Sequence, residues 1–234
     1  MSGTKKSTTA LVVGSLTIMI VVGGCRIGEA VGLKAQKVPT AEEKKAQIVK
    51  QLDRKFENPD AHCELGQLYH QQGLYDQAGY HYNVALRFDP AHRGAQAGLV
   101  KLLIDRKKTA ESRAKATEFM GQVAESAGES VKLARALDAQ GVDDYALASY
   151  QQALRLQPES AEIFRDLGYY HLKRKQNDIA KQYFTRSFQL NANQPDVAGE
   201  LGRMGVEVRV PQPAEKKIGW WDRIRKRLAE PKKQ

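Results

Sequence analysis

Cysteine is nearly absent from this sequence, and the residue patterns of the common enzymes and metal sites are missing. Two cysteines among 234 residues, Cys25 and Cys63, cannot build a disulfide framework. The five histidines include no His-x-x-x-His pair, and no zinc-ligand spacing exists. There is no glycine-rich phosphate loop, no Gly-x-Ser-x-Gly and no dinucleotide-binding fingerprint. We therefore predict that the chain is not an enzyme and has no cofactor or metal.

What the sequence does have is a period of 34 residues. Leucine recurs at this interval, at Leu65, Leu99, Leu133, Leu167 and Leu201. A small or modest residue follows each of them, at Gly66, Val100, Ala134, Gly168 and Gly202. A fixed period of this size indicates a stack of identical supersecondary units rather than a single globular core.

Positions within the period fit two antiparallel helices. In the first unit, Leu65 and Tyr69 share one face of a helix over 60–71, and Ala78 and Tyr82 share one face of a helix over 75–88. Gly73 permits a sharp turn between them. Asp89-Pro90 ends the second helix, because proline cannot continue it.

This pattern resembles the tetratricopeptide repeat. The first unit reads Leu65-Gly66-x-x-Tyr69 and Ala78-x-x-x-Tyr82, and the third and fourth units share most of it. The resemblance implies an all-α fold, a right-handed solenoid of helix-turn-helix repeats with capping helices. It implies a repeat domain over 59–207 with units 59–92, 93–126, 127–160 and 161–194 and a capping helix over 195–205. It also assigns the consensus aromatics to the core, at Tyr69, Tyr82, Tyr150 and Phe184.

Two parts of this domain carry their own expectations. A leading helix over 40–58 begins at a capping box, Thr40 to Glu43, with Ile48, Leu52 and Phe56 on one face. The second unit departs from the pattern, because Ala116 and Phe119 look exchanged in size and Lys107 replaces the turn glycine. The sequence does not decide whether this unit is a regular repeat. Cys63 is expected to be a small, half-buried side chain.

The resemblance also places a partner-binding groove on the first helix of each pair. Residues two positions after each leucine would line it, with Lys132 and Arg165 beside them. The candidate groove residues are Lys101, Lys132, Arg135, Arg165, Tyr169 and Arg203. One interpretation is a solvated face with internal ion pairs, each contributing about 0–1 kcal/mol. The other is a track for proteins or extended peptides, whose carboxylates the cations would bind through charge-assisted hydrogen bonds.

The first 25 residues have a different character. Lys5 and Lys6 precede an apolar stretch from Ala10 to Val22, and Val22-Gly23-Gly24-Cys25 follows. This resembles the lipobox of bacterial lipoproteins, which implies a signal peptide over 1–24, lipidation of Cys25 and a tether over 25–39. It places the chain in the bacterial cell envelope, anchored by lipid and facing the periplasm, and Arg26 favours the outer membrane. The alternative is an uncleaved anchor, although 17 apolar residues are at the lower limit for a span.

The segment 208–234 is expected to be a proline-containing linker followed by a basic amphipathic helix. Trp220, Trp221, Ile224 and Leu228 share one face, and Arg223 and Arg227 lie largely opposite. From 215 to 234 there are 8 basic and 3 acidic residues, so this stretch supplies +5 of the net charge of +10. The helix is expected to bind a membrane surface, dock on the last repeat or bind a partner. A basic chain also suggests nucleic acid, but an exported lipoprotein seldom meets any, and we predict no nucleic-acid partner.

Together these features predict a lipid-anchored periplasmic scaffold for protein–protein interaction in the assembly of an envelope, secretion or pilus-type complex. Pilotin-like lipoproteins are similar in plan. The alternative is a non-catalytic recruiter or regulator of a cell-wall enzyme.

Overall fold

The structure is a computed structural model that describes residues 39–208. This part of the chain forms ten α-helices and no β-strand, which confirms the all-α prediction. The helices are α1 (Ala41–Arg54), α2 (Pro59–Gln71), α3 (Tyr75–Phe88), α4 (Arg93–Asp105), α5 (Thr109–Gln122), α6 (Ala127–Ala139), α7 (Asp143–Leu156), α8 (Ala161–Lys173), α9 (Asn177–Leu190) and α10 (Pro195–Arg203).

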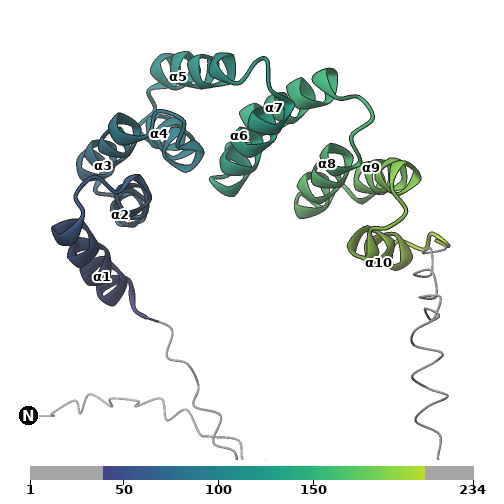
Figure 1. Ribbon diagram of the computed structural model, residues 1–234, viewed down its shortest axis with the longest axis horizontal. Coiled ribbons are helices and arrows are strands. Elements are labelled where there is room, and N and C mark those ends of the chain that lie inside the picture. The colour runs from purple at the N-terminus through teal and green to yellow at the C-terminus, as the bar shows by residue number, and fades with distance from the viewer. Residues whose placement is uncertain (1–38, 209–234) are drawn as a thin grey trace, which may run out of the picture. The chain divides into compact units, whose positions relative to one another are not determined.

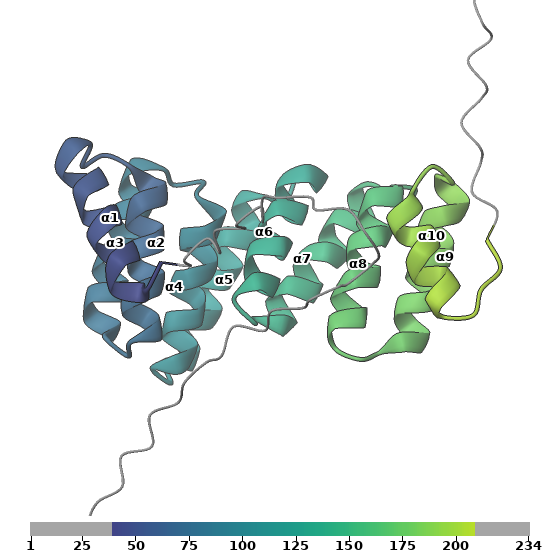
Figure 2. The same cartoon turned by 90° about the horizontal axis from the view of Figure 1, so that it is seen from below.

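Helices α2 to α9 form four helical pairs, and each pair packs on the next. The strongest packing is within the pairs α2–α3, α6–α7 and α8–α9, and α4 also packs against α2 and α6. Helix α1 packs against α2 and α10 against α9. In Figure 1 the first helices of the pairs lie toward the inside of the row and the second helices toward the outside, and Figure 2 shows the helices following one another in chain order. We call the exposed side of α2, α4, α6, α8 and α10 the groove face.

The first helix of each pair begins at a residue whose side chain accepts a backbone N–H three positions on. Asn58, His92, Ser126 and Ser160 serve as these caps. The capping box predicted for α1 is present, because Thr40 accepts from the Glu43 amide at 3.2 Å and Glu43 accepts from the Thr40 amide at 2.8 Å. Helix α1 ends at Arg54, earlier than expected. Ile48 and Leu52 are buried, but Phe56 lies beyond the helix and is exposed.

The turns inside the pairs answer the question about the second unit. Gly73 and Gly141 have φ values of 74° and 69°, in the left-handed region that glycine tolerates best. Lys107 and Lys175 take the same conformation, with φ values of 58° and 60°. Residues 93–126 therefore form a regular helical pair. Lysine holds the turn at a cost of about 1–2 kcal/mol relative to glycine.

Core volume is shared between positions rather than fixed at each one. Where glycine follows the repeat leucine, at Gly66 and Gly168, the second helix contributes an aromatic ring, Tyr82 or Phe184. The second unit reverses this arrangement: Val100 follows the leucine, Ala116 takes the position of Tyr82, and Phe119 is buried one turn later. The exchange in size therefore keeps the interior filled.

Two expectations about single residues were wrong. Cys63 is 4% exposed and thus fully buried, because α3 and α4 cover the α2 position that carries it. Tyr69 is only partly buried, since one side of its ring faces Lys45, whose Nζ lies 4.7 Å from the ring centroid. Tyr82, Tyr150 and Phe184 are in the core as predicted. Within residues 39–208, none of the helices combines the length and the apolar character needed to cross a membrane.

Candidate functional site

All six candidate groove residues lie on first helices and are at least partly exposed. Lys101 belongs to α4, Lys132 and Arg135 to α6, Arg165 and Tyr169 to α8, and Arg203 to α10. The 34-residue period brings them to one side because each first helix repeats the orientation of the one before it. The other candidates lie outside the described residues, namely Cys25, Trp220, Trp221, Arg223, Ile224, Arg227 and Leu228.

Arg135 joins the third repeat to the fourth. Its guanidinium donates to Asp166 Oδ2 at 2.7 Å and to Glu162 Oε1 at 2.6 Å, both on α8. Burial raises the pKa of Asp166, whose side chain is only 10% exposed, and the hydrogen bond from Arg135 opposes that rise. Arg165 Nε is 3.8 Å from the other oxygen of Asp166. Glu162, in contrast, is largely exposed, so a partner carboxylate can replace it without uncovering a buried charge.

Lys101 belongs to a smaller polar cluster on α4. Its ammonium donates to Asp105 Oδ1 at 2.6 Å, and His70 Nε2 on α2 lies 2.9 Å from Asp105 Oδ2. Burial alone would raise the pKa of Asp105, but the hydrogen bonds from Lys101 and His70 hold this pKa below its usual value. Sequence reasoning missed Asp105. The signal was available, because a residue four positions after Lys101 lies on the same face of the helix.

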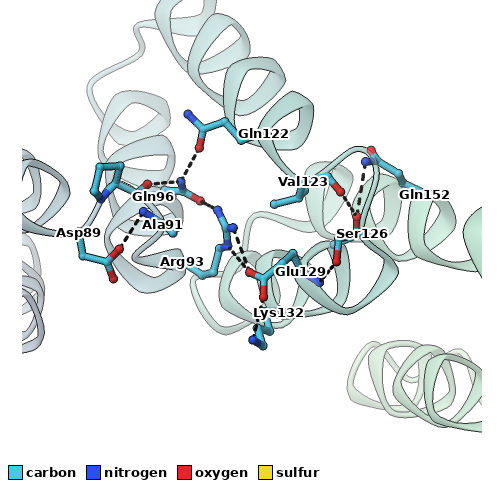
Figure 3. A network of polar contacts seen from close by, with 12 residues as sticks. Asp89, Ala91, Arg93, Gln96, Gln122, Val123, Ser126, Glu129, Lys132 and Gln152 are labelled. Atoms are coloured by element: carbon cyan, nitrogen blue, oxygen red, sulfur yellow. Dashed lines mark hydrogen bonds and ion pairs between the residues drawn. The ribbon is translucent and has the colours of Figure 1, made fainter.

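Lys132 is the exposed end of a network that joins the second and third repeats (Figure 3). It donates to Glu129 Oε1 at 2.8 Å, and Arg93 on α4 donates to Glu129 Oε2 at 3.0 Å. Arg93 also donates to the side chain of Gln96, which is completely buried and donates in turn to Gln122 Oε1 at 2.9 Å. The ionic contacts from Lys132 and Arg93 hold the pKa of Glu129 below its usual value.

Tyr169 and Arg203 contact the last helices. The Tyr169 hydroxyl donates to Asp196 Oδ2 at 3.3 Å, and its ring lies edge-to-face with Phe184 at 4.9 Å between centroids. Arg203 pairs with Glu200 on the same helix. Each candidate cation therefore has an acidic partner within the chain. The groove face is balanced in charge rather than a row of isolated cations.

Two pockets open on the groove face at equivalent places. The first pocket, of about 220 Å³, lies between α2 and α4 and has Tyr82 in its lining. The second pocket, of about 460 Å³, lies between α6 and α8 and has Tyr150 in its lining. Tyr82 and Tyr150 are 68 residues apart (150 − 82), which is two repeat lengths. Both tyrosines were predicted only as core residues, and nothing in the sequence pattern showed that they also reach pockets.

The remaining titratable residues in the interior favour neutral forms. His62 and His81 place their Nδ1 atoms 3.0 Å apart, and burial lowers the pKa of both, to about 4 for His81. Burial raises the pKa of Cys63 to about 12, and a thiol that stays protonated does not suit nucleophilic catalysis. Over residues 39–208, no three His, Cys, Asp or Glu side chains are grouped so as to hold a metal ion.

Comparison with known proteins agrees with the helical pairs. A profile of the tetratricopeptide repeat matches residues 46–93 and 131–195. The chain is a tetratricopeptide repeat protein. Its α4–α5 pair falls in the stretch between the two matched segments, where the sequence departs most from the consensus.

Individual relatives include proteins of two bacteria. The chain is 30% identical over 164 residues to the type IV pilus assembly protein PilF of Pseudomonas aeruginosa, covering 66% of this chain and 62% of PilF. It therefore spans less than two thirds of that relative. A solved structure of P. aeruginosa PilF is 28% identical, covers 62% of this chain and 67% of its own, and has a TM-score of 0.36. A structure of MamA from Desulfovibrio magneticus RS-1 is 19% identical, with coverage of 66% and 87% and a TM-score of 0.36.

Proposed function

We propose that this chain is a lipid-anchored periplasmic scaffold that holds a segment of a partner protein along its groove face during assembly of an envelope, secretion or pilus-type complex. The observation that carries the proposal is the pair of equivalent pockets on the exposed side of the first helices. The identity to a protein named for type IV pilus assembly supports the choice of process.

The ion pairs on the groove face suit exchange with a partner. The groove-face cations are held in place by carboxylates, of which Glu162 is largely exposed and Asp166 and Asp105 are more sheltered. A partner carboxylate or carbonyl can take the place of Glu162 while Asp166 continues to orient the Arg135 guanidinium. Charge-assisted hydrogen bonds of this kind are about twice as strong as neutral ones. The preformed geometry also lowers the ordering cost of binding.

The test is the double substitution Lys101→Gln with Arg135→Gln. We expect tagged, full-length protein carrying it to lose most partner capture from solubilised envelope, as measured by mass spectrometry. A matched control, Lys115→Gln with Lys181→Gln, removes the same charge from exposed positions on α5 and α9 and should capture partners normally. Circular dichroism would check that all proteins stay helical.

Two results would contradict the proposal. Equal capture by the groove variant and the control would place binding elsewhere. A captured set consisting of cell-wall hydrolases or synthases would favour the recruiter of a cell-wall enzyme instead.

The lipid anchor is the second part of the proposal and rests on Val22-Gly23-Gly24-Cys25. Cys25→Ser should leave an unprocessed precursor that no longer incorporates labelled fatty acid, whereas Cys63→Ser should be labelled normally. Persistent labelling of the Cys25 variant would remove the anchor from the proposal.

We propose further that the basic segment around Trp220 and Trp221 adds a second membrane contact, because one lipid chain alone anchors only reversibly. Vesicle flotation of the Cys25→Ser chain would test this part. Flotation with anionic vesicles that weakens as salt rises supports it. An absence of flotation, with tryptophan emission already blue-shifted before vesicles are added, indicates docking on the repeats.

A further inference from the structure

The first pocket contains a buried hydroxyl group that has no hydrogen-bond partner. Tyr82 is 0% exposed, and its Oη is one of two buried side-chain atoms in residues 39–208 without a partner. A buried polar group is normally satisfied, so such an exception needs an explanation. Burial also raises the pKa of this phenol, which keeps its proton available for donation.

Two glycines explain why the hydroxyl lies there. A Cβ placed on Gly66 would come within 2.8 Å of the Tyr82 ring, and one placed on Gly98 would come within 2.6 Å. The ring from α3 thus passes between the backbones of α2 and α4, where no side chain fits. Its far end reaches the first pocket on the groove face. A phenylalanine would pack equally well, so packing alone does not account for the hydroxyl.

The neighbouring groups offer mainly donors around a balanced charge. Lys101 Nζ uses one hydrogen toward Asp105 and carries two more. Asp105 is also bonded by His70. The carboxamides of Gln67, Gln71 and Gln140 complete the lining. The volume of about 220 Å³ is several times the roughly 30 Å³ that one liquid water occupies, so the pocket has room for a small organic group.

We propose that the first pocket binds a primary carboxamide, the side chain of a glutamine or asparagine in the partner segment, an inference that rests on the proposed function. The carboxamide oxygen accepts hydrogen bonds from Tyr82 Oη and Lys101 Nζ, and its amino group donates to Asp105 or to a glutamine carbonyl of the lining. A carboxylate fits less well, because it would lie beside Asp105, which already offsets the charge of Lys101. A hydrocarbon leaves the tyrosine hydroxyl without a partner.

The second pocket provides an internal comparison. Tyr150 occupies the equivalent position, but four charged side chains line that pocket, Arg135, Asp138, Asp166 and Lys173. Selectivity for a neutral amide therefore belongs to the first pocket. Tyr150→Phe is the matched control for Tyr82→Phe, since each substitution removes one hydroxyl from the same position of a repeat.

The experiment uses ¹⁵N-labelled full-length protein titrated with propionamide and, separately, with propionate. We expect propionamide to shift the backbone amide signals of Gly66, Gly98 and Lys101, and to bind more tightly than propionate. Tyr82→Phe should weaken propionamide binding about fivefold or more, the effect of one lost hydrogen bond. Tyr150→Phe should leave it unchanged. Because the hydroxyl has no partner in the fold, Tyr82→Phe should retain the helical spectrum.

Three outcomes overturn the inference: equal or tighter binding of propionate, propionamide shifts away from the first pocket, or equal affinity for Tyr82→Phe and wild type. These outcomes are separate from failure of the proposed function, which is read from partner capture by the Lys101→Gln, Arg135→Gln variant. If capture depends on the groove face but propionamide does not bind, only the carboxamide assignment is wrong. If propionamide binds as expected but capture ignores the groove face, the scaffold proposal is wrong and the assignment stands for the pocket itself.

Discussion

The close approach of α8 and α9 makes one substitution a sharp test of the packing. Gly168→Ala would place a Cβ 2.4 Å from the ring of Phe184, which is completely buried and rests edge-to-face on Tyr169. The ring is rigid and enclosed, so it cannot move aside freely. Gly202 occupies the same position after the repeat leucine in α10, but a Cβ there meets nothing within 4 Å. Gly202→Ala is therefore a matched control from the same chain.

The expected magnitude follows from two opposing effects. Replacing glycine with alanine inside a helix contributes about 1 kcal/mol of stability. Overpacking a core by one methyl group costs about 1–3 kcal/mol. Ala134 beneath Tyr150 shows that a repeat can accommodate alanine when its helices are spaced for it, so the cost at Gly168 is that of moving α8 from α9. We expect a net loss of about 1–2 kcal/mol for Gly168→Ala and a gain of up to about 1 kcal/mol for Gly202→Ala.

Urea unfolding followed by circular dichroism would measure both changes. A difference of about 2 kcal/mol between the two variants corresponds to about 4–8 °C in Tm for a unit of this size. The slope of the unfolding curve should stay the same, because the surface exposed on unfolding does not change. If Gly168→Ala is as stable as Gly202→Ala, Phe184 does not pack on the Gly168 backbone, and the argument from shared core volume fails.

Two further predictions concern stability. Leu167→Ala should lower the free energy of unfolding by about 2–5 kcal/mol, because Leu167 is 0% exposed and its removal leaves a cavity; Leu156→Ala, at an exposed position, should change it by less than about 0.5 kcal/mol in the same urea titration, and similar effects of the two would show that the repeat phase is misassigned. Stability should also fall as pH is lowered from about 6.5 toward 4, because the pKa values of His62 and His81 are lowered in the fold, so the unfolded chain binds more protons in this range. Urea midpoints at pH 7 and pH 5 would measure this dependence, His81→Gln should reduce it, and an unchanged dependence in that variant would assign it to other groups.

The positions of the helices and the phase of the core could be predicted from the sequence. Leu133, Leu167 and Leu201 are among the most buried side chains, and α3 ends at Phe88, directly before Asp89-Pro90. These predictions succeed because the period, the caps and the proline act over a few residues along the chain. Exchange of Ala116 and Phe119 could not be interpreted in the same way, because whether the volume is conserved depends on the neighbouring helix.

The sequence by itself determined that this protein is a stack of helical repeats with one face built from first helices. Only the tertiary structure decided what that face offers to a partner. Arg135 reaches Asp166, 31 residues on, and His70 reaches Asp105, 35 residues on, so the state of each charge depends on the repeat beside it. The unpaired hydroxyl of Tyr82 likewise depends on two glycines from different helices. Local patterns fix which residues share a helix face, but distances between repeats decide which of those residues are already paired and which can bind.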